Sequence, residues 1–120
     1  MVLHECALGA EPGLVALESA PTSSGDTYVK GAGDISMVKL DDLRLGRIDM
    51  LKIDTEGFEL PIVKGARDTL LRCKPVVVVE QKGRDERYHG DAKDAAVQFL
   101  AELGMKPLRA PISGDHILGW

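Results

Sequence analysis

The sequence has few cysteines and no long hydrophobic run. Its 120 residues contain two cysteines, Cys6 and Cys73, which stand far apart and outside any Cys-x-x-Cys pattern. Two isolated cysteines in a chain of this length indicate a reducing compartment. A Cys6–Cys73 disulfide is the alternative. The longest aliphatic run, residues 76–79, is too short to span a bilayer, and the first residues lack the features of a signal peptide. We therefore expect a cytoplasmic protein with no membrane partner.

The sequence also lacks an excess of positive charge. The formal net charge is -4, the sequence pI is about 5.3, and the basic residues are interleaved with acidic ones. Proteins that bind nucleic acids through phosphate contacts need a basic face, so we expect no nucleic-acid partner. The three histidines, His4, His89 and His116, have no metal-ligand spacing, which argues against a zinc site. A solvated loop position is the favoured interpretation of His89, and a place over a cleft is the alternative.

The sequence otherwise predicts one globular α/β domain over residues 1–120. Hydrophobic residues make up 44% and charged residues 28% of the chain, which is ordinary for such a domain. From residue 48 onward the pattern reads strand, helix, strand, helix, strand, strand, and this order predicts a mostly parallel sheet. The expected strands cover residues 2–8, 14–17, 36–40, 48–54, 76–80, 106–110 and 116–120, and the expected helices cover residues 61–73 and 91–103.

The residues between the early strands contain a Gly-x-Gly pattern at residues 31–33. It neither follows a clean buried strand nor opens a helix, as a phosphate-binding loop would. We interpret residues 30–34 as an irregular loop, with a phosphate cradle as the alternative. Residues 14–17 are expected to return against residues 2–8 as a hairpin.

The segment Asp54-Thr55-Glu56-Gly57 is the most informative feature of the chain. It follows an apolar strand and precedes a helix, and ligands of open α/β sheets bind outside the carboxyl ends of strands. Asp54 and Glu56 are two residues apart and would share a face if both were extended. Such a pair can bind a metal ion, hold a substrate hydroxyl or supply a general base. The alternative is that Asp54 caps the turn while Glu56 and Glu59 decorate a helix N-terminus.

A second strand, residues 76–80, also ends in an acid, Glu80. Adjacent parallel strands end at the same edge of a sheet, so Glu80 is expected to lie near Asp54. This pairing favours a cleft over a merely structural role for the acids. Asp41 is expected to end a strand and cap the turn after it, with a place in the cleft as the alternative.

Several segments together resemble the FkbM family of methyltransferases. They are VKLDDL (38–43), IDMLKIDTEGFE (48–59), VKGA (63–66) and KPVVVVE (74–80), preceded by CALG (6–9). The resemblance implies a partial class I, Rossmann-like methyltransferase fold with S-adenosylmethionine as its cofactor. It also implies O-methylation of a sugar or another small-molecule hydroxyl.

The resemblance further implies roles for individual residues. Asp54, Glu56 and Glu80 would be the catalytic residues at the ends of the two central strands, where a carboxylate can orient or deprotonate an acceptor hydroxyl. Ala7, Leu8 and Asp54 would contact the cofactor. The residues themselves do not decide which carboxylate is the base.

The chain also departs from the family pattern. Members begin with two strands that carry a Gly-x-Gly-like cofactor loop and a ribose-binding acid, and this chain starts after both. The resemblance therefore covers the C-terminal part of the family domain, with the first two strands lacking. Because those strands would lie beside residues 48–54, that strand is expected to have an unpaired edge, which is an aggregation hazard unless it is covered.

We consider three ways to cover this edge: pairing with residues 2–8 or 36–40, pairing with a second copy in a homodimer, or a partner chain. Three functions remain open. The first is methyl transfer, the second is a non-catalytic remnant that works as an assembly module, and the third is an acidic site for a hard metal cation.

Overall fold

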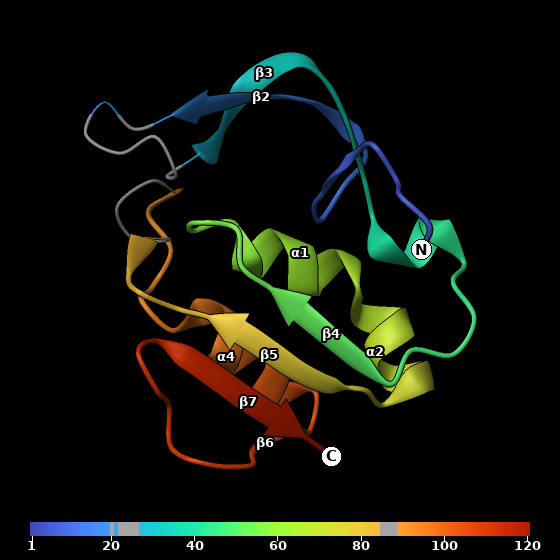
Figure 1. Cartoon of the computed structure of the whole chain (residues 1–120), viewed down its shortest axis with the longest axis vertical. Helices are drawn as coiled ribbons and strands as arrows, with labels where there is room; N and C mark the ends of the chain where they lie inside the picture. The colour runs from blue at the N-terminus through green and yellow to red at the C-terminus, as the bar shows by residue number, and fades with distance from the viewer. Residues whose placement is uncertain (20, 22–26, 85–88) are drawn as a thin grey trace.

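Two β-sheets and a set of helices make up the fold (Figure 1). The structure is a computed structural model, and it describes residues 1–19, 21, 27–84 and 89–120. The smaller sheet lies above the larger one in Figure 1, and helices α1 (Glu59–Gly65) and α4 (Ala95–Glu102) lie behind the larger sheet. The candidate site lies at the carboxyl ends of the two parallel strands of the larger sheet.

The larger sheet contains β4 (Met50–Ile53), β5 (Val76–Glu80), β7 (Asp115–Gly119) and β6 (Lys106–Pro107), in the order β4-β5-β7-β6. Among the described strands of this sheet, β4 and β5 pair in parallel, while β7 pairs antiparallel with both β5 and β6. The α/β class is confirmed, while the expectation of a mostly parallel sheet is not, because both sheets are mixed.

The core lies between one face of this sheet and the helices. Val77 and Val79 of β5 are fully buried, as alternation along a strand requires when one face is covered. They pack in one cluster with residues of α1 (Glu59–Gly65), α2 (Arg67–Cys73) and α4 (Ala95–Glu102). None of the helices in the described ranges is long and apolar enough to cross a bilayer.

A break at Ala66 divides the helix expected over residues 61–73 into α1 and α2. The second helix has its own N-terminal cap from a distant residue. The Asp41 carboxylate accepts hydrogen bonds from the backbone N–H groups of Asp68 (3.1 Å) and Thr69 (2.8 Å). These donors lack partners within the helix, so the cap favours a new helix start. Asp41 therefore caps α2 from the 3-10 helix η1 (Leu40–Leu43).

The smaller sheet has the order β1-β3-β2, formed by β1 (Ala7–Leu8), β3 (Thr27–Val38) and β2 (Gly13–Ser19). The expected hairpin of residues 2–8 with 14–17 is wrong, since β2 pairs with β3 and β1 runs parallel to β3. Residues 30–34 lie within β3 and not in a separate loop, but the irregularity expected there is present as a register shift that leaves residues 31–34 without partners in β2. Gly33 is required there: a Cβ atom would come within 2.6 Å of the Val15 carbonyl oxygen, beside the register shift of β2.

The edge of β4 is unpaired within the described part of the chain. β4 is the outermost strand of its sheet and has β5 as its one neighbour. Residues 7–8 and 36–38 belong to the smaller sheet, so the idea that an early strand pairs with β4 is wrong. Met50 on β4 is 65% exposed.

Candidate functional site

The candidate site begins with a constrained turn between β4 and α1. After Asp54 the backbone passes through Glu56 (φ 57°) and Gly57 (φ 105°), both in the left-handed region. A non-glycine residue there is strained and needs support from its surroundings.

Glu59 provides the support for this turn. Its side chain is 1% exposed, and its Oε1 atom accepts hydrogen bonds from the Thr55 backbone N–H (3.0 Å), the Thr55 hydroxyl (3.1 Å) and the Gly57 N–H (3.1 Å). A buried carboxylate with several donors is a strong local constraint. Glu59 thus fixes the path of the backbone that presents Glu56.

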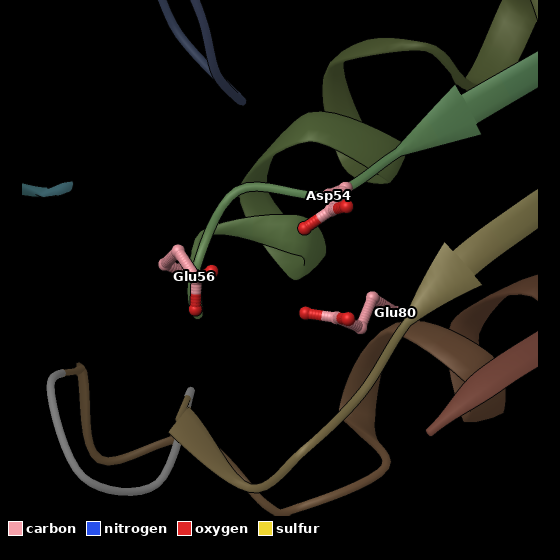
Figure 2. A group of neighbouring side chains, drawn as sticks. All are labelled: Asp54, Glu56 and Glu80. Atoms are coloured by element: carbon pink, nitrogen blue, oxygen red, sulfur yellow. The ribbon is translucent and has the colours of Figure 1, made fainter. Parts of the chain in front are cut away.

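Three carboxylates meet at this end of the sheet (Figure 2). Asp54 follows β4, Glu80 ends β5, and Glu56 lies on the turn, and one oxygen from each lies within 4.8 Å of the others. Figure 2 shows the three groups facing a common space. The parallel pairing of β4 with β5 places Glu80 beside Asp54, as the sequence predicted.

Each of these carboxylates also has its own cationic partner. Lys52 donates a hydrogen bond to Asp54 (2.9 Å), Lys82 pairs with Glu80, and Arg84 pairs with Glu56. The three cations therefore balance the three negative charges when all are ionised. This arrangement stabilises the charged carboxylates despite their mutual repulsion.

The hydrogen bond from Lys52 holds the pKa of the Asp54 carboxyl below its ordinary value, and partial burial opposes that shift. The positive charges of Lys52 and Lys82 lower the Asp54 pKa further. An acid with a lowered pKa is a weak general base, so the electrostatics favour an orienting role for Asp54 over proton uptake.

A cavity of about 530 Å³ lies between the smaller sheet and the turn after β4. Its size is typical of pockets for small molecules and cofactors. The predicted cofactor-contacting residues, Ala7, Leu8 and Asp54, all line it. The remaining wall residues are mostly apolar: Cys6, Leu17, Thr27, Val29, Ile35, Thr55, Phe58 and Ile62.

The sequence did not indicate a role for Phe58, favoured a solvated loop position over a place at the cleft for His89, and indicated a minor role for Glu59. Phe58 lines the cavity, and His89 packs against the Phe58 ring instead of standing in solvent. The role of Glu59 was predictable from its position in the sequence, because an acid at the start of a helix can accept hydrogen bonds from the preceding turn. His89 and Phe58 are far apart in the sequence, and no local pattern indicates their contact.

These features place the chain among α/β proteins with a methyltransferase-like fold. The structure resembles the crystal structure of methyltransferase FkbM from Methylobacillus flagellatus KT, with a TM-score of 0.52 and 19% sequence identity. The alignment covers 98% of this chain and 27% of that one, so the chain spans about a quarter of that protein.

The family model described as the methyltransferase FkbM domain matches residues 4–107. The chain belongs to the FkbM methyltransferase domain family, as its sequence segments indicated. No curated protein matches the chain.

Proposed function

We propose that the chain takes part in methyl transfer from S-adenosylmethionine to a hydroxyl group of a sugar or another small molecule. The observation that carries the proposal is the convergence of Ala7, Leu8 and Asp54 on one cavity. Membership of the FkbM methyltransferase domain family supports a methyl donor as the ligand.

The lining of this cavity fits such a donor. Apolar side chains, including Phe58 and Ile62, offer contacts for a flat base, and the Asp54 carboxylate can accept hydrogen bonds from ribose hydroxyls or an amine. When bound, S-adenosylmethionine supplies an electrophilic methyl group on a sulfonium sulfur. The negative charge of Asp54 would favour a cationic ligand nearby.

The predicted catalytic roles of Asp54, Glu56 and Glu80 stay proposals. Ion pairs with Lys52 and Arg84 hold the carboxylates of Asp54 and Glu56 in place near Glu80, which suits the group to bind and orient an acceptor. The lowered pKa of Asp54, caused first by the Lys52 hydrogen bond, argues against Asp54 as the proton acceptor.

Calorimetric titration of the chain with S-adenosylmethionine and with S-adenosylhomocysteine tests the proposal. We expect both to bind, and we expect Asp54→Asn to weaken binding by roughly tenfold because one charge-assisted hydrogen bond is lost. Asp49→Asn is the matched control, since Asp49 forms an exposed ion pair with Arg47 away from the cavity.

Two outcomes would count against methyl transfer by this chain. Absence of heat with either ligand at millimolar concentration would leave the assembly-module hypothesis. Equal loss of affinity in the Asp54→Asn and Asp49→Asn variants would show that the cavity is not the binding site.

A divalent cation at the three carboxylates is the second candidate function. Their oxygens lie within 4.8 Å of one another, and carboxylates are the preferred ligands of Mg²⁺ and Ca²⁺. Such an ion has to displace Lys52, Lys82 and Arg84 from their partners. A rise in Tm with Mg²⁺ that disappears in Asp54→Asn would support this candidate, and an unchanged Tm would reject it.

A further inference from the structure

A second cavity adjoins the first one and shares lining residues with it. It has a volume of about 390 Å³, and Phe58 and Val29 line both cavities. The second cavity has a more polar wall, which includes Lys30 of β3 and His89. Two adjoining cavities of different character suit two different ligands.

His89 forms the boundary of this second cavity together with Phe58. The two rings meet edge to face, with centroids 5.2 Å apart and an interplanar angle of 65°. This arrangement is favourable for aromatic rings and orients the imidazole. The side chain of His89 is therefore held by packing against a ring that lines both cavities.

The Nε2 atom of His89 has an unsatisfied hydrogen-bonding capacity. It is buried, and it has no hydrogen-bond partner among the residues that the structure describes. A buried polar atom without a hydrogen-bond partner is unfavourable unless a ligand or a water molecule forms a hydrogen bond with it. Because His89 also lines the second cavity, its unsatisfied Nε2 atom is a candidate contact for a ligand bound there.

We propose that the second cavity is the acceptor subsite and that Nε2 of His89 accepts a hydrogen bond from the hydroxyl to be methylated. This inference rests on the proposed function and adds the place of the acceptor to it. The hydroxyl oxygen forms the new C–O bond with the donor's methyl carbon, and the S–C bond breaks with its electron pair going to sulfur. The hydroxyl proton passes to Nε2.

The surrounding groups support histidine in this role. Asp54 is poorly suited to take up a proton because its pKa is lowered, first by the Lys52 hydrogen bond, and Glu56 is paired with Arg84. Histidine is the side chain that most often performs general acid–base catalysis near neutral pH. His89 therefore fills a role that the carboxylates leave open.

The cavity also restricts the acceptor to a class. Its volume of about 390 Å³ accommodates a small molecule, and its wall combines an aromatic ring with polar groups. Such walls suit polyhydroxylated rings, which have both apolar faces and hydroxyl edges. The inferred acceptor is a hydroxylated ring compound of monosaccharide size.

The test is an NMR titration of the full chain, labelled with 15N at histidine, using methyl α-D-glucopyranoside as the probe. The titration is run with and without S-adenosylhomocysteine. We expect the His89 ring resonances to shift on addition of the probe, and Nε2 to be the unprotonated ring nitrogen at mildly alkaline pH. His89→Gln should weaken probe binding roughly tenfold, as expected for one lost hydrogen bond.

His4→Gln is the control, because His4 is exposed and lies outside the lining of both cavities. It should bind the probe like the wild type, and both variants should bind S-adenosylhomocysteine with wild-type affinity. The wild-type titration decides the inference even where His89→Gln does not fold. A His89 ring that does not respond to the probe, or that is protonated at Nε2, would overturn the acceptor subsite. Failure of S-adenosylhomocysteine to bind the wild type would instead overturn the proposed function.

Discussion

Glu59 determines the geometry of the turn after β4 at the level of a single side chain. Its buried Oε1 atom accepts three hydrogen bonds from Thr55 and Gly57. Removing it in Glu59→Ala leaves buried donors unsatisfied, so we expect a loss of about 1–3 kcal/mol in the free energy of unfolding. Glu59→Gln keeps a carbonyl acceptor and should lose less. Urea unfolding measures both changes.

The control for this prediction is Glu102→Ala, at an exposed position near the end of α4. It should change the free energy of unfolding by less than about 0.5 kcal/mol, as is usual for surface substitutions. Equal stability of Glu59→Ala and Glu102→Ala would show that the turn does not depend on the Glu59 carboxylate.

The Asp54 carboxyl should make stability depend on pH. Its pKa in the folded chain is lowered, first by the Lys52 hydrogen bond, so the ionised form stabilises the fold. This contribution is present above the pKa of the unfolded chain, about 4, and is lost as pH falls through the folded value. Wild type should therefore exceed Asp54→Asn in stability near neutral pH, and the difference should shrink below about pH 4. Urea unfolding across this pH range measures the difference in stability between the two proteins. A difference that does not change with pH would contradict stabilisation of the fold by the ionised form of Asp54.

At the level of elements, the close contact of α1 with the segment after β1 joins the two sheets. A Cβ atom on Gly65, the last residue of α1, would come within 2.0 Å of the Gly9 carbonyl oxygen. Gly65→Ala must push the elements apart, so we expect a loss of about 1–3 kcal/mol in the free energy of unfolding. Gly46→Ala is the control, because nothing lies within 4 Å of its Cβ position. Equal stability of the two variants would argue against this packing.

The elements differ in how far the sequence predicts them. Residues 76–80 are a β-branched run, and they form β5 with those bounds because the run has no competing signal. Residues 30–34 contain two glycines and a charge at either end, which is typical of a loop, yet they lie within β3. The pairing of β2 with Lys30 and Ile35, on either side of the register shift, keeps this stretch within the strand, and the bulge requires a small residue at Gly33. A single sequence does not contain that tertiary information.

The sequence likewise predicts some parts of the candidate site and not others. The closeness of Asp54 and Glu80 follows from two neighbouring strands that each end in an acid, so it was predictable. The cations beside these acids were not expected as partners, although Lys52 and Lys82 each lie two residues from their acid, a spacing that puts side chains on one side of an extended chain. The contact of Phe58 with His89 depends on long-range packing and has no sequence signal.

At the level of the whole molecule, the feature that bears on assembly is the edge of β4, which is open among the residues that the structure describes. β4 has one neighbour in its sheet, and Met50 on it is 65% exposed. We propose that a second copy or a partner chain covers this edge. Light scattering at micromolar concentrations should then give a mass above that of the monomer. Met50→Lys should reduce it, because a charge disfavours strand addition at an edge.

Leu14→Lys is the control for the edge, since Leu14 is 60% exposed on β2 of the other sheet. It should leave the mass unchanged. A monomeric wild type, or equal effects of the two substitutions, would contradict pairing through β4.

The central proposal is that the cavity between the smaller sheet and the turn after β4 binds the methyl donor. An NMR titration of the 15N-labelled chain with S-adenosylhomocysteine tests it most directly. The predicted result is a set of saturable shifts concentrated at the backbone amides of Ala7, Leu8, Thr55 and Phe58, which line this cavity. The absence of saturable shifts, or shifts concentrated instead around the separate hollow beside Arg44 and Arg72, would contradict it.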